Sequence, residues 1–180
     1  MRDFTYHRPA DLAAAAALVA KAEEPRLVAG GMSLLPSMKL RLATPSDLID
    51  LADIGTLQGI AVTAGAVRIS AMTCHADVAA HADVRRVLPA LAELADGIGD
   101  PAVRHRGTIG GSIANADPAA CYPAAVVGLD ATVETTRRKI PGDQFFTGLF
   151  STALEADEIP YAVVGAMALN AHGYRAEALH

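Results

Sequence analysis

The chain has 180 residues, a formal net charge of −5 and a hydrophobic fraction of 52%. That length suits one sizeable core, or two small subdomains that share one, and that apolar fraction excludes a disordered chain. The acidic balance and the scattered basic residues argue against a nucleic-acid-binding surface. The longest late apolar run, residues 159–169, is too short to span a bilayer, so we expect no membrane span.

Cysteine and histidine spacing indicates no metal site. Cys74 and Cys121 lack C-x-x-C spacing, so the thiolates of this chain alone cannot hold zinc or an iron–sulfur cluster. His75 and His81 are not on one helical face, and we expect both to be surface histidines. The few cysteines suit a reducing compartment, and we expect a cytoplasmic protein.

Residues 1–55 predict a small α/β subdomain. Apolar residues at helical spacing predict a helix over residues 9–23, which Pro25 ends. Around it we expect strands at 4–6, 26–29 and 47–51 and a short helical turn or loop at 32–42. Asp47, Asp50 and Asp53 flank the last strand, where solvated strand ends explain them better than a paired acid and base.

Residues 56–159 predict a larger α+β subdomain. Residues 59–63 and 66–71 alternate around Ala64-Gly65 and predict a β-hairpin. The other elements expected are helical segments at 74–96, interrupted at Pro89, and at 123–127, a strand at 131–135, a turn at 137–142 and an apolar segment at 145–150. We assign residues 160–180 to a divergent C-terminal tail.

Two glycine-rich segments carry the strongest functional signal. In residues 27–36 a buried strand runs into two glycines and a serine, and in residues 104–118 three glycines lie in a bend with Thr, Ser and Asn side chains. Successive N–H groups in such bends form anion-binding concavities, and glycine lets a ligand approach the backbone. Each segment alone is also explained by an ordinary turn. Together they suggest a dinucleotide gripped from two sides.

Residues 97–102 match the pattern G-x-G-x-x-A formally. A dinucleotide-binding turn of that type follows a strand and opens a helix, whereas here a helical pattern precedes the glycines. We therefore reject this segment as a dinucleotide fingerprint.

The two glycine segments, in this order, resemble the FAD-binding (medium) subunit of the molybdenum hydroxylases, the carbon monoxide dehydrogenase and xanthine dehydrogenase family. The resemblance covers residues 3–159. It is carried by Ala29-Gly30-Gly31-Met32-Ser33-Leu34-Leu35-Pro36, Asp100-Pro101-Ala102-Val103-Arg104, Gly107-Thr108-Ile109-Gly110-Gly111-Ser112-Ile113-Ala114-Asn115 and Phe145-Phe146-Thr147-Gly148.

The resemblance implies an α/β (α+β), two-subdomain FAD-binding fold of the PCMH/vanillyl-alcohol-oxidase type that lacks the family's C-terminal domain. It implies an FAD-dependent oxidoreductase subunit that relays electrons from a [2Fe-2S] small subunit through FAD to an acceptor. The substrate would be oxidised at molybdopterin in a separate large subunit. No catalytic residue is assigned to this chain, because in a flavoprotein the isoalloxazine ring carries the redox chemistry.

The resemblance also implies which residues contact FAD. Residues 29–34 and 108–112 would take the diphosphate through N–H and hydroxyl groups, and Asn115 and Asp117 would lie near the ribityl or flavin end. Cys121 stands where the family usually has an aspartate, so a carboxylate becomes a weak acceptor. The full expected set is Val28, Ala29, Gly30, Gly31, Met32, Ser33, Leu34, Thr108, Ile109, Gly110, Gly111, Ser112, Ala114, Asn115 and Asp117.

Two other interpretations stay open. A non-catalytic truncated remnant or interaction module would keep the fold without binding flavin, and Cys121 and the tail motivate it. Residues 160–175 look like the opening of a nucleotidyltransferase-type domain, but the paired aspartates of such domains do not follow in this sequence.

Overall fold

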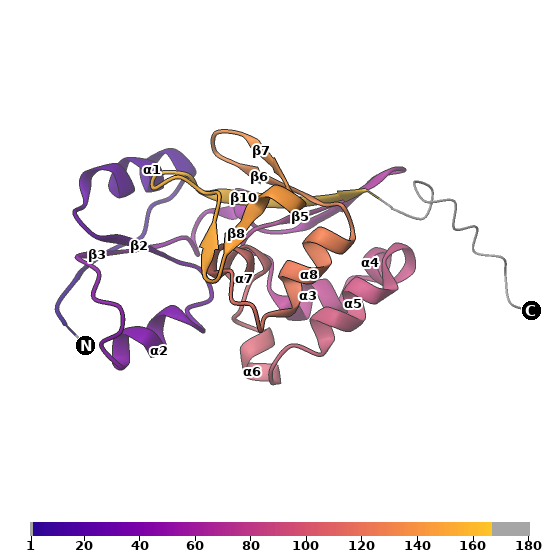
Figure 1. The fold of residues 1–180 in the computed structure, drawn as a ribbon, viewed down its shortest axis with the longest axis horizontal. Helices are drawn as coiled ribbons and strands as arrows, with labels where there is room; N and C mark the ends of the chain where they lie inside the picture. Colours follow the sequence, from indigo (N-terminus) through magenta and orange to yellow (C-terminus); the bar gives the residue numbers. More distant parts are fainter. Residues whose placement is uncertain (1, 167–180) are drawn as a thin grey trace, which may run out of the picture.

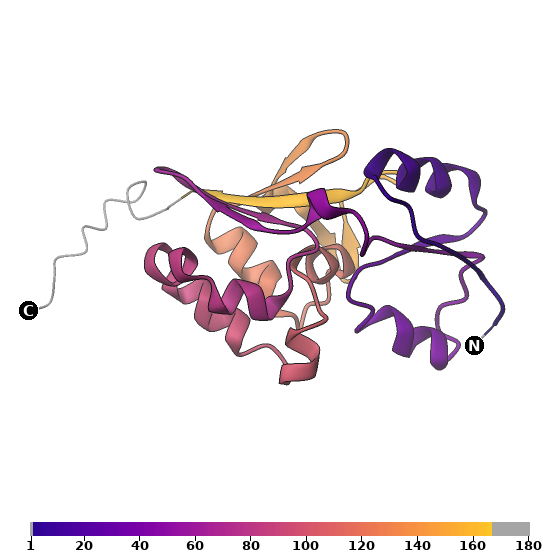
Figure 2. The ribbon, with the colours of Figure 1, turned by 180° about the vertical axis from the view of Figure 1, so that it is seen from behind.

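Two sheets organise the chain, and the computed structural model, which describes residues 2–166, places them side by side (Figures 1 and 2). The smaller sheet is parallel, with strand order β1-β3-β2. Its strands are β1 (Thr5–His7), β2 (Pro25–Val28) and β3 (Asp47–Asp50), and helices α1 (Leu12–Lys21) and α2 (Leu34–Lys39) lie on its two faces. Residues 5–50 thus form a parallel sheet with one helix on each face.

Local chemistry explains where α1 begins and which face it buries. The carboxylate of Asp11 accepts the Ala14 N–H at 2.8 Å and so caps the first turn. Ala15 and Val19, one helical turn apart, are buried in one apolar cluster with Ile49 of β3. The helix starts later than the expected residue 9, because Pro9 lies before the cap.

The larger sheet is antiparallel, with five strands in the order β4-β5-β10-β6-β7. These are β4 (Ile60–Val62), β5 (Ala66–Ser70), β6 (Thr132–Thr135), β7 (Lys139–Pro141) and β10 (Pro160–Ala166). The helices of this half gather on one face of the sheet (Figure 1): α3 (His75–Ala80), α4 (Ala82–Val87), α5 (Pro89–Asp96), α6 (Pro101–Arg104), α7 (Ile109–Asn115) and α8 (Cys121–Gly128).

Shorter elements complete the described fold. A single turn, η1 (Gly55–Leu57), joins the two sheets, and α9 (Gly142–Phe145) follows β7. A two-stranded sheet pairs β8 (Phe146–Gly148) with β9 (Ser151–Thr152). Within residues 2–166, no helix has the length and apolarity needed to cross a bilayer.

Alternation along β5 explains why the helices cover only one face of the larger sheet. Val67 and Ile69 are buried in the core beneath the sheet, whereas Arg68 between them lies on the other face. There the Arg68 Nε lies 3.2 Å from a carboxylate oxygen of Glu134 on β6. The expected hairpin of β4 and β5 is confirmed, with Ile60 opposite Ile69.

The C-terminal strand β10 corrects the expected boundary of the tail. Ala162 pairs with Ser70 of β5 on one side and with Glu134 of β6 on the other, so β10 is the central strand of the larger sheet. Residues 160–166 are therefore part of the fold, and a tail that starts at residue 160 starts too early. Residues 167–180, where most of the expected tail and of the nucleotidyltransferase-like run falls, lie outside the described residues.

Two other local expectations have clear outcomes. The turn expected at 137–142 is wrong in part, because β7 pairs with β6 over Lys139–Pro141 and only the residues before it turn. The rejection of residues 97–102 as a dinucleotide fingerprint is confirmed. Helix α5 runs to Asp96, and Asp100 caps α6, so no strand precedes these glycines.

The two halves share part of their core. The apolar cluster that holds Ala15 and Ile49 also contains Ala71, Met72 and Ile159, which come from the loop after β5 and from the start of β10. The smaller sheet ends at Asp50 and the larger begins at Ile60, so the expected division between residues 55 and 56 falls between them.

A buried carboxylate fastens the chain just before β10. The Glu158 side chain is fully buried and accepts hydrogen bonds from Thr135 Oγ1 at 2.5 Å, Arg138 Nε at 3.0 Å and the Glu155 N–H at 3.0 Å. Burial by itself would raise the pKa of Glu158, but these hydrogen bonds outweigh it and hold the pKa at about 2. The charged form of Glu158 therefore stabilises the fold.

We predict that Glu158→Gln lowers the free energy of unfolding at pH 7 by about 1.5–3 kcal/mol, the usual range for a hydrogen bond to a charged group. Because the folded-state pKa is lowered from 4.5 to about 2, the stabilisation is present above pH 4.5 and is lost as the pH falls toward 2. Urea unfolding at pH 7 and pH 3 checks this. The variant should lose stability at pH 7 and show a weaker acid dependence than the natural chain. Glu155→Gln, at a half-exposed partner of Arg138, is the control and should change little. Equal effects of the two substitutions would contradict the prediction.

Candidate functional site

The two glycine segments meet at the seam between the subdomains. Gly30 follows β2, and a Cβ added to it would overlap the carbonyl oxygen of Arg106 and lie 2.7 Å from the Gly107 Cα. A Cβ on Gly111 would lie 3.3 Å from the Ala29 Cβ. The segments are far apart in the sequence but touch in the fold, as the idea of a two-sided grip requires. Several of these glycines are needed for contact between backbones, not only for contact with a ligand.

The first segment presents a row of unused donors. The N–H groups of residues 30–34 have no hydrogen-bond acceptor within residues 2–166, and the next bond of the segment is from the Leu35 N–H to the Gly31 oxygen, at 3.1 Å. Gly31 has φ +74°, a conformation that glycine adopts without strain. The Ser33 hydroxyl is exposed and does not cap α2. Five consecutive free N–H groups and a hydroxyl form a donor set suited to an anion.

The second segment is a helix start, not the open bend expected. Thr108 caps α7, and its Oγ1 accepts the Gly111 N–H at 3.1 Å. The Ile109 N–H is bonded to the Thr73 oxygen and the Gly110 N–H to the Ala71 oxygen, at 3.1 and 2.8 Å. These two N–H groups are thus bonded within the protein, and the contact of Ile109 and Gly110 with a ligand stays a prediction. Both residues are buried and position the segment.

Other donors of the second segment stay available. The Thr108 N–H has no acceptor within residues 2–166. The side chains of Ser112 and Asn115 are half-buried and make no hydrogen bond in the described part of the chain. The Asp117 carboxylate is partly used, because its Oδ1 accepts the Ala119 N–H at 2.9 Å. The second segment therefore offers a ligand mainly polar side chains and one backbone N–H group, whereas the first segment offers a row of backbone N–H groups.

A cleft of about 680 Å³ opens beside the seam. Of the expected contact residues it is lined by Val28, Ala29, Gly30, Gly31 and Thr108. The rest of the expected set is not on its wall: Met32, Ser33, Leu34, Ile109, Gly110, Gly111, Ser112, Ala114, Asn115 and Asp117. The cleft has the volume of a small-molecule site.

The cleft also contains side chains that sequence reasoning did not assign to a site. The Tyr6 hydroxyl donates to Asp50 Oδ2 at 2.5 Å, and this hydrogen bond raises the pKa of Tyr6. Cys74 and Arg106 line the wall that the larger subdomain contributes. Tyr6 lies on β1 and Asp50 on β3, which are neighbouring parallel strands. A prediction that these two strands pair would have placed the two side chains together.

The three spaced aspartates act as the expected strand-end groups. Each one pairs with a residue of the N-terminal segment instead of with another carboxylate. Asp47 Oδ1 lies 2.7 Å from His7 Nε2, Asp50 accepts from Tyr6, and Asp53 pairs with Arg8. The arrangement ties β1 to the loop after β3 and offers no acid–base pair.

His75 corrects the expectation of two surface histidines. It is 5% exposed, and burial lowers its pKa to about 4. A Cβ on Gly107 would lie 2.6 Å from His75 Nε2, and the imidazole ring centre is 5.3 Å from the Tyr122 ring centre. The neutral side chain of His75 therefore packs against Gly107 of the second glycine segment. His81 is half-exposed.

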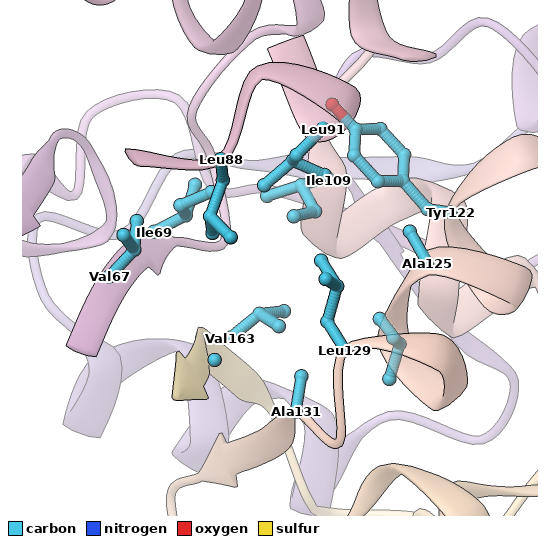
Figure 3. Close-up of a pocket in the computed structure, with 12 residues that line it drawn as sticks. Val67, Ile69, Leu88, Leu91, Ile109, Tyr122, Ala125, Leu129, Ala131 and Val163 are labelled. Carbon is cyan, nitrogen blue, oxygen red and sulfur yellow. The ribbon is translucent and has the colours of Figure 1, made fainter. Parts of the chain in front are cut away.

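A second cavity lies inside the core and does not suit a cofactor. It measures about 20 Å³ and is enclosed by apolar side chains from β5, β10 and helices α5, α7 and α8, among them Val67, Leu91, Ile109 and Val163 (Figure 3). That volume is close to that of one water molecule, and its lining offers almost no polar partner. This cavity is a packing gap of the core.

Comparison with known proteins assigns the family. Residues 2–164 match the family described as FAD binding domain in molybdopterin dehydrogenase. The chain belongs to this family. It is 43% identical to the carbon monoxide dehydrogenase medium chain of Hydrogenophaga pseudoflava over 87% of this chain and 56% of that protein. It is 40% identical to the medium chain of Afipia carboxidovorans over 98% of this chain and 63% of that protein.

Solved structures agree with this membership of the FAD-binding domain family. Carbon monoxide dehydrogenase of Hydrogenophaga pseudoflava superposes with a TM-score of 0.90 at 41% identity, covering 92% of this chain and 59% of that chain. Quinoline 2-oxidoreductase of Pseudomonas putida 86 gives 0.90 at 34% identity, covering 92% and 60%. The α/β fold class expected from the sequence is confirmed. The chain spans roughly three fifths of the length of the relatives it matches.

The contact at Gly30 yields a stability prediction. Gly30→Ala would place a methyl group against the Arg106 carbonyl, where only backbone movement can relieve the overlap, so we expect a loss of about 1–3 kcal/mol of unfolding free energy or more. Thermal and urea unfolding measure it. Gly65→Ala is the matched control, because nothing lies within 4 Å of a Cβ at Gly65. Equal stability of the two variants would show that the seam does not depend on the missing side chain.

Proposed function

We propose that the chain binds FAD at the seam and serves as the FAD-binding subunit of a molybdenum-hydroxylase-type oxidoreductase. The observation that carries the proposal is the row of free N–H groups at residues 30–34, found in a member of a family of FAD-binding domains. The diphosphate of FAD is ionised at neutral pH and can only accept hydrogen bonds. A row of backbone N–H groups supplies the donors that such an anion needs.

The donors of the two segments divide the task. Residues 30–34 and the Ser33 hydroxyl hold the diphosphate, and the Thr108 N–H adds a donor from the opposite side. The free side chains of Ser112 and Asn115 face the ribityl chain, with Asn115 and Asp117 toward the flavin end. Ile109 and Gly110 fix the position of α7 through their bonds to Thr73 and Ala71. The bound FAD supplies the redox chemistry, and these residues bind and orient it.

The place of the subunit in a complex is part of the same proposal. Relatives of the chain are named medium chains and FAD-binding subunits of dehydrogenases. We propose a molybdopterin-binding large subunit and a [2Fe-2S] small subunit as partners, with electrons passing from the cluster through FAD to an acceptor. The non-catalytic remnant is not favoured, because the donor row and the glycine at position 111 are both intact.

Flavin binding is tested on the purified 180-residue chain. The protein is mixed with FAD and desalted, and its visible absorption spectrum is recorded. We expect flavin absorption to elute with the protein in stoichiometric amount. A chain that is folded by circular dichroism but retains no flavin, and shows no FAD binding by calorimetry, would contradict the proposal.

Gly111→Val tests the position of the cofactor. A Cβ at Gly111 would lie 3.0 Å from Thr108 Oγ1 and 3.3 Å from the Ala29 Cβ, so the side chain of a valine would enter the space between the segments, where the nearest neighbours of its Cβ are side-chain atoms. We expect the fold to be largely kept and FAD affinity to fall by at least about tenfold, or about 1.4 kcal/mol. Calorimetric titration with FAD measures the affinity. Gly128→Val, at an open position on α8, is the control and should bind FAD normally. Unchanged affinity of Gly111→Val would show that the ligand lies elsewhere.

A further inference from the structure

The turn between β8 and β9 exposes two large apolar side chains. Leu149 is 77% exposed and Phe150 is 63% exposed. Phe150 has φ +52°, a strained conformation for a bulky residue and one for which glycine or asparagine is the usual choice. Turn geometry therefore does not explain an aromatic residue here. A strained residue with an exposed ring indicates a contact made by the side chain.

This turn is fixed to the end of α7. The Phe150 N–H donates to the carbonyl oxygen of Ala116 at 3.1 Å. Ala116 is itself left-handed, with φ +47°, and closes α7 through N–H bonds to its last turn. Within the turn, the hydroxyls of Thr147 and Ser151 are hydrogen-bonded at 2.9 Å. The backbone that carries the two apolar side chains is thus fixed to the residue between Asn115 and Asp117.

The same turn lies on the side of the molecule that holds the seam. Figure 1 shows β8 alongside α7, between the helices of the larger subdomain and the smaller sheet. Helix α7 has seven residues and is about 10 Å long. Gly111 in its first turn lies against Ala29, the residue before the donor row, and Ala116, which caps its end, accepts the hydrogen bond from the turn. A ligand that runs along α7 from the diphosphate end would reach Leu149 and Phe150 with its other end.

We infer that Leu149 and Phe150 form an apolar wall against which the isoalloxazine ring of FAD packs. This inference rests on the proposed function, because it takes the diphosphate to be bound at residues 30–34. The ring is flat and largely apolar over its dimethylbenzene part, and an aromatic side chain packs well against such a surface. The protein thereby uses the turn to shield one part of the ring from water.

Comparison of FAD with ADP isolates the flavin end, because ADP carries the diphosphate and adenosine but no ring. The 180-residue chain, Phe150→Asn and Leu149→Ser are titrated with each nucleotide. Asparagine tolerates the left-handed conformation, so Phe150→Asn removes the ring while the turn is kept. Leu42→Ser is the matched control, since Leu42 is 79% exposed on the smaller subdomain, after α2.

The inference predicts that Phe150→Asn lowers FAD affinity about tenfold and Leu149→Ser about threefold, with ADP affinity unchanged in both. Iodide should quench the fluorescence of bound FAD more strongly in both variants than in the natural chain or in Leu42→Ser. Unchanged FAD affinity and unchanged quenching would overturn the inference and assign the turn to a protein partner, while the proposed function would stand. Equal losses for FAD and ADP would also overturn it, because the turn would then act on the diphosphate. A natural chain that binds neither nucleotide would refute the proposed function, and the inference with it.

Discussion

The close approach of two backbones at the seam is the constraint on which the site depends. Gly30 lies against the Arg106 carbonyl, Gly107 against His75, and Gly110 against Ala71, each at a distance that excludes a Cβ. Hydrogen bonds lock the last two contacts, from the His75 N–H to the Gly107 oxygen and from the Gly110 N–H to the Ala71 oxygen. The loop of residues 30–34 and the start of α7 are placed by these contacts before any ligand arrives, so the donor set is preorganised.

The two glycine segments look alike in sequence but do different work. In α7 the helix start uses its own N–H groups on Thr73, Ala71 and the Thr108 cap, so little of the backbone is left for a ligand. Before α2 the backbone turns at Gly31, which has a positive φ, and the N–H groups of residues 30–34 have no acceptor in the described chain. The first segment therefore offers N–H groups to a ligand, whereas the N–H groups of the second fix the position of α7. The number of glycines in each segment does not show this difference.

Much of the fold could be predicted because its signals are local. The apolar spacing of Ala15 and Val19, the alternation around Arg68 and the turn at Ala64-Gly65 each depend on a few neighbouring residues. The burial of His75 could not be predicted, because it comes from Gly107 and Tyr122, which reach it only in the folded chain. The glycines mark points of close approach, as the sequence predicts. A glycine-rich sequence indicates positions without room for a side chain. It does not indicate whether a ligand or another backbone segment fills the space.

The central place of β10 has a consequence for how the chain is made. β5 and β6 do not pair with each other, and β10 joins them although it is the last described strand. During synthesis β4–β5 and β6–β7 therefore exist first as separate hairpins, each with one edge awaiting a partner. Such unpaired edges are templates for association with other chains. Until residues 160–166 join the sheet, the chain therefore presents the inner edges of β5 and β6 to other chains as well as to its own last strand.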